Sequence, residues 1–252
     1  MLPGRHVFLL SHMRAYTSLF GHIMGSNPAI CGYYEMHIGY HSWRSFVRQK
    51  LLYFENEPPK PGYTYMFDKI LHNDHDIRPA VLDSPRSRIL FALRPPRETL
   101  PSILSLYRSV DPGHAFNSAD FATRYYIDRL GELERLAGSM QRDYLYFDAP
   151  ALVDNTDQCL RTISEWLGLD RPLSREYDLQ AKTSAERYGD SSERISSGRI
   201  TTRTGGAGAE TVDAALVEEA TSAWKRTRER ILEGSGQHCL SGACTADSGG
   251  AG

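Results

Sequence analysis

Apolar runs alternate along the chain with segments in which apolar residues recur at helical spacing. Strands are predicted at Arg5–Ser11, Tyr63–Leu71, Arg88–Leu93 and 143–147, and a short strand or extended turn at 31–40. Helices are predicted from Thr17 to the Ser26-Asn27-Pro28 break, and at 43–54, 98–108, 121–140, 156–167 and 213–232. Because strands and helices alternate, we expect an α/β fold, a three-layer sandwich with a central, mostly parallel sheet.

Two polar stretches fall outside this alternation. Residues 182–208 are rich in Gly, Ser, Thr and Arg, and we predict a mobile loop there. Gly, Ser and Ala dominate from Glu233 onward, which predicts a disordered tail. The chain has 252 residues, and we therefore expect one α/β domain over 1–232 followed by a tail over 233–252.

Charge and hydropathy narrow the function classes. Lys and Arg number 29 and Asp and Glu 31, a net charge of −2. A protein that coats nucleic acid is usually basic, so we expect no nucleic-acid partner, while a local basic site for a small anion stays open. No apolar run approaches the ~20 residues of a membrane span. The run Val7–Leu10 is too short for a signal peptide, so we expect a cytoplasmic location.

Metal-binding and disulfide patterns are weak. The four cysteines, Cys31, Cys159, Cys239 and Cys244, are too few and too scattered for a disulfide framework, and we interpret the last two as unpaired thiols in the tail. The run 72–76, His-Asn-Asp-His-Asp, contains metal-ligating residue types. Five adjacent loop residues rarely converge on one ion, so we expect no metal and interpret this run as a solvated turn or the rim of an acceptor site.

The first strand, loop and helix form a candidate anion site. The segment contains no G-x-x-x-x-G-K-[ST] run, so it is not a Walker A motif. It does contain Arg14, followed by Thr17 and Ser18 at the start of the helix. An arginine fork and two hydroxyls match phosphate or sulfate oxygens, although a helix cap beside a surface arginine has the same pattern.

A second segment strengthens the anion interpretation. Arg94 ends a buried strand, and Ser102 follows eight residues later on the next helix. The first turns of that helix lie near the strand end, so Arg94 and Ser102 can converge on one anion. Ligands of open α/β sheets bind beyond the carboxyl ends of the strands, where Arg14 also lies. Two anion sites at one sheet edge predict one ligand with two anionic groups.

These segments resemble those of the sulfotransferase family that uses 3′-phosphoadenosine 5′-phosphosulfate (PAPS), in its bacterial type. The family's 5′-phosphosulfate loop, typically R-S-G-T-T, resembles Arg14-Ala15-Tyr16-Thr17-Ser18. Its 3′-phosphate segment, an Arg at a strand end with a Ser eight residues on, resembles Arg94 to Ser102. The resemblance implies a P-loop-NTPase-like sulfotransferase fold, PAPS as donor, and cofactor binding by these residues. One departure is Tyr16, where the family has a glycine that lets the backbone approach phosphate closely.

Later segments resemble the family less specifically. Tyr146-Phe147-Asp148 is similar to its Y-E-D strand, and 160–169 to its FLGL helix. The runs 187–190 and 197–199 are similar to its late cofactor-covering loop. The resemblance then implies cofactor contacts by Tyr146, Arg187, Gly189 and Arg199.

Sulfuryl transfer needs a base for the acceptor proton and cations for the growing negative charge. Arg14 is a candidate cation, and Lys69 stands near the position of a family lysine. Glu35 resembles the carboxylate base of tyrosylprotein-type and bacterial members. His72 resembles the histidine base of the cytosolic members, with a Lys-to-His spacing of three rather than two. We favour Glu35 and keep His72 as the alternative.

The leading hypothesis is therefore sulfuryl transfer from PAPS to a hydroxyl or amine of a small-molecule or saccharide acceptor. The acceptor pocket is expected from loops 33–62 and 108–125, whose sequence does not specify the acceptor. One alternative is a nucleotide kinase-like phosphotransferase, which the missing Walker A lysine disfavours. The other is a non-catalytic nucleotide-binding relative, which Tyr16 keeps open. The sequence specifies no oligomeric state.

Overall fold

A single parallel sheet forms the centre of the fold. The computed structural model of the chain describes residues 4–180, 196–201 and 210–241. Its strands are β1 (Arg5–Leu10), β2 (Ile30–Cys31), β3 (Tyr65–Ile70), β4 (Ser87–Leu93), β5 (Leu145–Asp148) and β6 (Gln237–Cys239). Within the described residues these six strands lie in the order β2-β3-β1-β4-β5-β6, each pair parallel. The predicted α/β fold class is confirmed.

The central strands are buried on both faces, as their continuous apolar runs predict. β1 pairs with β3 from Arg5↔Tyr65 to Leu10↔Ile70, and with β4 from His6↔Ser87 to Leu10↔Phe91. In-register parallel pairing brings the carboxyl ends of β1, β3 and β4 to one edge of the sheet, which we call the carboxyl edge. The segments that follow these strands therefore begin side by side.

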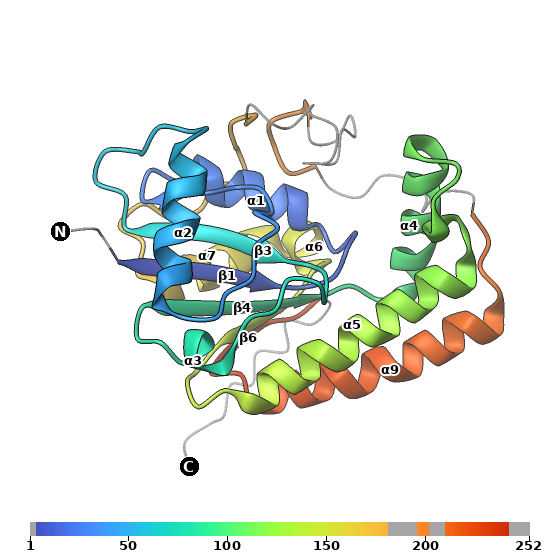
Figure 1. Cartoon of the computed structure of the whole chain (residues 1–252). Helices are drawn as coiled ribbons and strands as arrows, with labels where there is room; N and C mark the ends of the chain where they lie inside the picture. The colour runs from blue at the N-terminus through green and yellow to red at the C-terminus, as the bar shows by residue number, and fades with distance from the viewer. Residues whose placement is uncertain (1–3, 181–195, 202–209, 242–252) are drawn as a thin grey trace, which may run out of the picture.

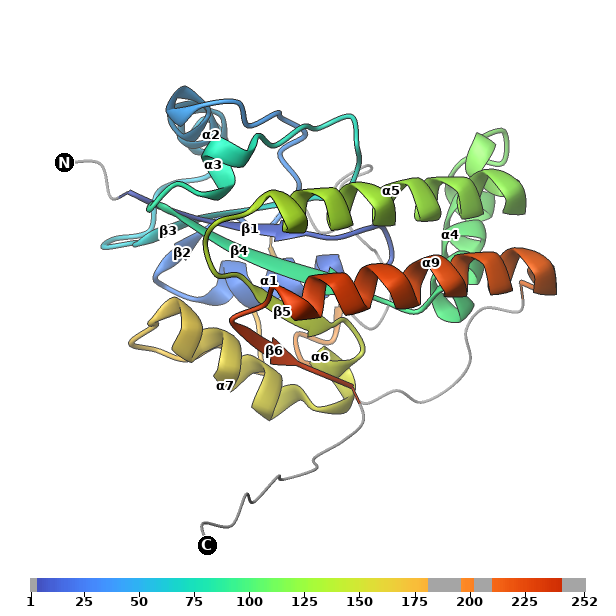
Figure 2. The same cartoon turned by 90° about the horizontal axis from the view of Figure 1, so that it is seen from below.

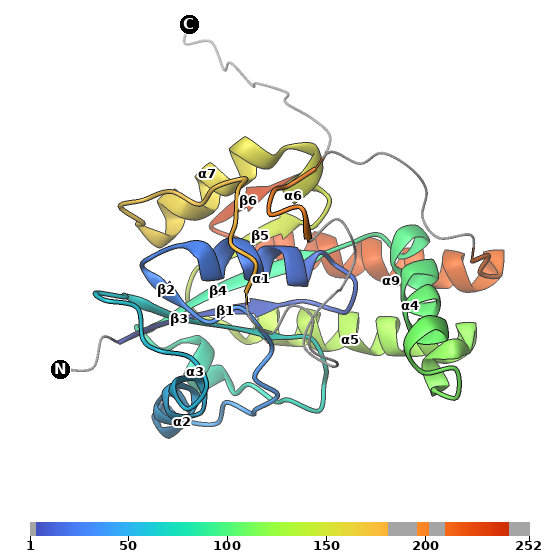
Figure 3. The ribbon, with the colours of Figure 1, turned by 90° about the horizontal axis from the view of Figure 1, so that it is seen from above.

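Helices cover both faces of the sheet. They are α1 (Thr17–Ser26), α2 (Trp43–Phe54), α3 (Pro79–Leu82), α4 (Pro96–Val110), α5 (Ala119–Ser139), α6 (Ala151–Asp154), α7 (Thr156–Leu167) and α9 (Ala214–Glu233), with a 3₁₀ turn η1 (Ala115–Asn117). One core cluster lies between the sheet and α1, α6 and α7, and a second between the sheet and α3, α5 and α9 (Figures 1 and 3). α5 and α9 run side by side along their face (Figure 2), and α4 stands beyond the arrowheads of β1 and β4 (Figure 1).

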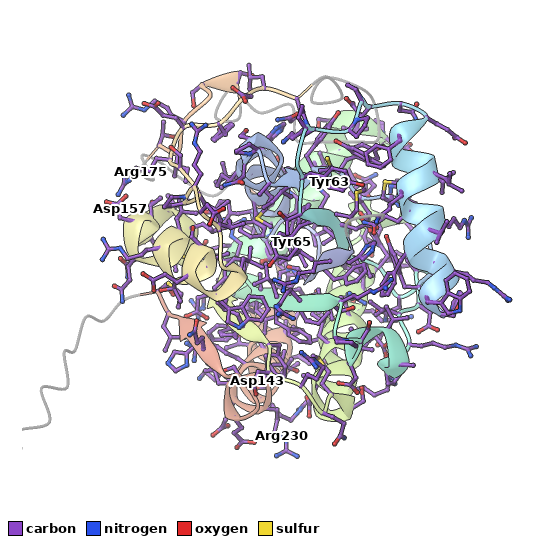
Figure 4. The ribbon with its side chains drawn as sticks, turned by 90° about the vertical axis from the view of Figure 1, so that its left-hand side faces the viewer. Tyr63, Tyr65, Asp143, Asp157, Arg175 and Arg230 are labelled. Carbon is purple, nitrogen blue, oxygen red and sulfur yellow. The ribbon has the colours of Figure 1, made fainter. Side chains whose placement is uncertain are left out.

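In the first core cluster, α7 contacts β3. Tyr65 lies in the interior (Figure 4) and its phenol donates a 2.5 Å hydrogen bond to the Leu167 carbonyl. At the surface of α7 the guanidinium of Arg175 meets the carboxylate of Asp157 at 2.5 Å (Figure 4). The buried hydroxyl contact fixes where α7 ends against β3, whereas the exposed ion pair adds little to stability.

Most predicted elements are present, and 31–40 is the exception. The helices at 43–54 and 156–167 have their predicted bounds. The segment 31–40, predicted as a short strand or extended turn, is a strand only at Ile30–Cys31 and has no regular strand beyond. Gly32 turns the chain with φ 110°, and a Cβ there would collide with the Phe67 carbonyl. The chain then crosses the carboxyl edge as a loop, which pairs again only at the Tyr40↔Ile77 bridge.

The predicted tail is wrong from 233 to 241. α9 ends at Glu233, and β6 then pairs with β5 through Phe147↔Cys239, where Cys239 is buried in the first core cluster. The Ser241 N–H donates to Asp148 at 3.0 Å. The polar composition concealed this strand because its pairing depends on the exposed edge of β5. Residues 242–252 lie outside the described residues, and the division of the chain into domain and tail stays a prediction.

The predicted loop over 182–208 lies mostly outside the described residues. The described part, 196–201, is anchored: the Tyr177 N–H donates to the Gly198 carbonyl at 2.9 Å, and the Ile200 N–H to the Arg175 carbonyl at 2.8 Å. Ile200 is buried in the first core cluster. Among the helices that the structure describes, none is both long and apolar enough to cross a bilayer.

Candidate active site

The loop between β1 and α1 has a left-handed backbone at two residues. Arg14 has φ 61° and Tyr16 φ 55°, a region that side-chain-bearing residues rarely adopt. The loop is held at its start by Ser11, whose hydroxyl donates to the Ala92 carbonyl of β4 at 2.7 Å. α1 then begins at Thr17 without a side-chain cap, so its first N–H groups are donors that can bind an anion.

Tyr16 adopts the backbone conformation expected of the glycine that stands at this position in the sulfotransferase motif. Its backbone is left-handed, φ 55° and ψ 21°, the conformation for which glycine is usually selected. Its half-buried ring lies under the guanidinium of Arg94, with 4.4 Å from the Arg94 Cζ to the ring centre. Tyrosine therefore adds a cation–π contact to the next candidate anion residue.

Arg14, Arg94 and Ser102 meet at the carboxyl edge. The Arg14 Nε donates to the Ser102 Oγ at 2.8 Å, and the Arg94 guanidinium donates to the Arg14 carbonyl at 2.8 Å. The three residues come from two segments 80 or more positions apart in the sequence. Arg94 also forms a 3.1 Å ion pair with Glu98 on α4. Anion binding by this cluster stays a prediction, and an anion there competes with Glu98 for Arg94.

His12 holds the backbone of Arg94, a role that the sequence did not indicate. Its Nδ1–H donates to the Met13 carbonyl at 2.9 Å and its Nε2 accepts the Arg94 N–H at 3.1 Å. Complete burial lowers the His12 pKa to about 3, so the ring is neutral and both contacts persist at neutral pH. The Arg94 carbonyl accepts a 2.7 Å hydrogen bond from Tyr126. The backbone of Arg94 is thus fixed at both of its polar groups.

Glu35 lies in the loop that crosses the carboxyl edge. It is only 7% exposed, and its Oε1 accepts the Leu71 N–H at 3.1 Å. The next residue, Met36, donates its N–H at 3.0 Å to Asp68, which also accepts a 2.5 Å hydrogen bond from Tyr40. Burial raises the Asp68 pKa to about 7. The loop is therefore anchored to β3 and to Leu71 just after it, through Glu35 itself and through the following residues Met36 and Tyr40.

Tyr125 connects the loop that contains Glu35 to the loop between β1 and α1. Its hydroxyl donates to the Leu71 carbonyl at 2.9 Å and accepts the Met13 N–H at 2.9 Å. Leu71 donates its N–H to Glu35, and Met13 directly precedes Arg14. The Tyr125 phenol therefore joins the loop of Glu35 to the loop of Arg14. The candidate base and the candidate anion cluster therefore belong to one hydrogen-bonded arrangement.

Arg129 is a buried cation beneath this arrangement. It is 1% exposed, and its guanidinium donates to the carbonyls of Ser11 and Ile70 at 2.9 and 2.7 Å and to the Asn73 side chain at 2.8 Å. It thus holds the ends of β1 and β3 together. A charged residue beside the apolar positions Tyr126 and Leu130 of the 121–140 helix was the sequence signal for this role.

Lys69 and His72 lie near Glu35. Lys69 is buried near the end of β3, and its charge lowers the pKa of His37 after the larger effect of burial. His72 is half-buried, with its ring centre 5.5 Å from that of Tyr125. Burial lowers the His72 pKa, while the charge of Glu35 opposes this. Both base candidates therefore lie in the same part of the carboxyl edge.

Of the three other predicted cofactor residues Tyr146, Arg187 and Gly189, only Tyr146 is described, and it lies apart from the Arg14 cluster in the core. Tyr146 is fully buried in the second core cluster and donates 2.6 Å to Asp148, which pairs with Arg228 at 2.8 Å. In this structure Tyr146 therefore packs in the core beside α9, and its cofactor contact stays a prediction. Arg187 and Gly189 lie outside the described residues.

Arg199 is placed elsewhere. It is exposed and lines a cavity of about 460 Å³ between the C-terminal end of α1 and residues 171–178. Neither Arg14 nor Arg94 lines this cavity. The cofactor role of Arg199 stays a prediction.

Three solved structures are similar to this chain at low sequence identity. The sulfotransferase domain from the curacin biosynthetic pathway is 11% identical with a TM-score of 0.47, over 92% of this chain and 98% of that one. A mouse sulfotransferase complexed with PAP is 13% identical with a TM-score of 0.45, over 88% and 75%. Retinol dehydratase in a complex with retinol and PAP is 13% identical with a TM-score of 0.44, over 90% and 82%.

No family model matches the chain, and no curated protein matches it. The case for function therefore depends on the residues of the carboxyl edge.

Proposed function

We propose that the protein transfers the sulfuryl group of PAPS to a hydroxyl or amine of a small-molecule or saccharide acceptor. The observation that carries this proposal is the contact of Arg14 with Ser102, at 2.8 Å, beside Arg94. Two segments that each resemble an anion site of PAPS sulfotransferases meet at one edge of a parallel sheet. A ligand with two anionic ends, such as PAPS, matches this arrangement.

The donor's two anionic groups have separate partners in the proposal. Arg14 and the first N–H groups of α1 bind the 5′-phosphosulfate, while Arg94 and Ser102 bind the 3′-phosphate. Support comes from the uncapped start of α1 and from the fixed backbone of Arg94. When bound, PAPS supplies a sulfuryl group attached to a phosphate leaving group.

Glu35 takes the acceptor proton in this proposal. As the acceptor oxygen or nitrogen forms its bond to sulfur, the carboxylate of Glu35 accepts the proton that the acceptor loses. The bond from sulfur to the bridging phosphate oxygen breaks, and Arg14 neutralises the negative charge that grows there. The hydrogen bonds through Leu71 and Tyr125 support this division of roles, because they link the two residues' loops.

Ligand preference tests the donor class. Adenosine 3′,5′-bisphosphate (PAP) should raise the unfolding temperature, because a ligand at 100 times its Kd adds about 2.7 kcal/mol to the unfolding free energy. ATP with Mg²⁺ should have a smaller effect, since the β1–α1 loop contains no Walker A lysine. Stabilisation by ATP with Mg²⁺ alone would favour a phosphotransferase.

Turnover tests the activity itself. With PAPS and a panel of phenolic, alcoholic, amine and saccharide acceptors, PAP should accumulate in step with a sulfated product. PAP binding without turnover on any acceptor would favour a non-catalytic nucleotide-binding protein.

A further inference from the structure

Two histidines approach Glu35 from different loops at the carboxyl edge. His37 follows Glu35 by two residues, and His75 belongs to the loop after β3. One ligating atom from each of Glu35, His37 and His75 lies within 4.8 Å of the others. The two loops are joined beside this cluster, where the Tyr40 N–H donates to the Asp76 carbonyl at 2.7 Å.

The histidine nitrogens are spaced as ligands of one small ion. His37 Nδ1 and His75 Nε2 are 3.2 Å apart. In a tetrahedral zinc site with Zn–N bonds of about 2.0–2.1 Å, two ligating nitrogens lie about 3.3–3.4 Å apart. An ion between the two rings therefore needs almost no change in their separation. It also replaces the single N–H···N contact with two bonds to lone pairs.

The third ligand atom is held in place by the fold. One oxygen of the buried Glu35 carboxylate accepts the Leu71 N–H, which leaves the other able to coordinate a metal. His37 has a left-handed backbone, φ 52°, and one of its ring nitrogens lies within 4.8 Å of a Glu35 carboxylate oxygen. A carboxylate and two imidazoles form a donor set typical of three-ligand zinc sites with an open fourth position.

We propose that Glu35, His37 and His75 bind one divalent transition metal ion of the zinc class. Mg²⁺ and Ca²⁺ are poor occupants, because both prefer all-oxygen shells. The site fastens the two loops together and leaves its fourth position to water or to an acceptor atom. Bound metal also occupies the lone pair that Glu35 needs as a base, so zinc inhibits sulfuryl transfer. That last consequence rests on the proposed function, whereas the binding itself does not.

Calorimetric titration of the full chain with Zn²⁺, and separately with Mg²⁺, tests the site. We expect one Zn²⁺ per chain and no Mg²⁺ binding. His37→Ala and His75→Ala should each weaken Zn²⁺ by at least about tenfold, since even partners of a metal ligand contribute that much. His41→Ala is the matched control: His41 is exposed and pairs with Asp76 at 3.6 Å, and Zn²⁺ affinity should stay within twofold.

A spectrum with Co²⁺ in place of Zn²⁺ gives a second readout. Bound Co²⁺ should show the intense visible absorption of a four-coordinate ion, and His75→Ala should abolish it. His37 is exposed and His75 half-buried, so circular dichroism should show both variants folded. Absence of saturable Zn²⁺ binding, or binding that survives both variants or disappears in His41→Ala, would overturn the site. None of these outcomes depends on whether the protein turns over PAPS.

Discussion

The guanidinium of Arg94 lies over the ring of Tyr16, 4.4 Å from its centre. This contact joins the loop after β1 to the residue that ends β4, and it occurs where the sulfotransferase motif has a glycine. The tyrosine keeps the left-handed backbone that the position needs. It also orients a cation that we assign to the 3′-phosphate of the donor.

Removing the Tyr16 ring should weaken donor binding moderately. A cation–π contact at a partly exposed site contributes about 0.5–1 kcal/mol, so Tyr16→Ala should weaken PAP about two- to fivefold. Tyr16→Phe keeps the ring and the left-handed backbone, and its PAP affinity should match that of the wild type. Calorimetry of the three proteins decides this, and a loss in Tyr16→Phe equal to that in Tyr16→Ala would exclude the ring contact as the cause.

Hydrophobic patterning was sufficient to predict the layers of this fold. β1 and β4 contain continuous apolar runs buried on both faces, and the helix at 156–167 has a single apolar face, so burial specifies these elements. The helix at 43–54 was predicted from its spacing, although Trp43, Val47 and Leu51 on it are exposed. β6 was missed for a different reason. Gln237 and His238 are exposed and only Cys239 is buried, so the strand depends on the edge of β5 rather than on its own composition.

The candidate site was predictable where side chains follow strand ends. Arg14 lies in the loop after β1, Arg94 directly follows β4, and Ser102 is on the helix after it; parallel pairing of β1 with β4 brings these segments side by side. His12 and Tyr125 were not predictable, because their roles depend on contacts with residues far away in the sequence. The burial of Tyr146 was not predictable, because a three-residue motif does not say which face of the sheet a strand residue points to.

Glu35→Gln should slow sulfuryl transfer while leaving donor binding intact. The amide keeps the shape and accepts the Leu71 N–H, but it cannot take up the acceptor proton. A positioned base contributes roughly 10²–10⁴ in rate, so kcat should fall by that order. PAP affinity should stay within about twofold, because Glu35 faces the acceptor in our assignment. Steady-state kinetics together with PAP titration measure both quantities.

His72→Ala is the matched comparison for the base. If Glu35 is the base, this variant should retain most of its rate. A large loss of kcat in His72→Ala, with Glu35→Gln near the wild-type rate, would transfer the role of base to His72.

Stability should fall in mild acid partly because of His6. Burial lowers the His6 pKa from 6.5 to about 4 in the folded chain. The unfolded chain therefore binds more protons between pH 4 and 6.5, and stability falls as pH falls through that window. His6→Phe keeps the ring stack on Phe46, whose centre is 4.2 Å away. Between pH 7 and 5 the wild type should lose about 2 kcal/mol more unfolding free energy than this variant.

Urea unfolding at the two pH values gives this difference directly. Any loss of stability that His6→Phe causes at pH 7 cancels from the comparison, because each protein serves as its own reference. Equal pH dependence in the two proteins would show that folding does not lower the His6 pKa.

The strand after α9 should contribute measurably to stability. A chain that ends at Gly236 lacks β6, loses the burial of Cys239 and loses the Ser241 donors to Asp148, at 3.0 and 3.2 Å. We expect its unfolding free energy to fall by about 2–4 kcal/mol. A chain that ends at Ser241 keeps all three and should match the full chain in urea unfolding. Equal stability of the two truncated chains would contradict the structural role of β6.

The binding of PAP to wild type and to Arg94→Ala tests the central claim most directly. A charge-assisted contact to phosphate contributes about 1.5–3 kcal/mol, so Arg94→Ala should weaken PAP by about tenfold or more. Adenosine 5′-monophosphate, which lacks the 3′-phosphate, should lose little. Arg97→Ala, a change at an exposed arginine three residues on, should leave both affinities unchanged. If calorimetry instead shows equal losses for the two nucleotides in Arg94→Ala, or no PAP binding to the wild type, the assignment of this edge to PAPS is contradicted.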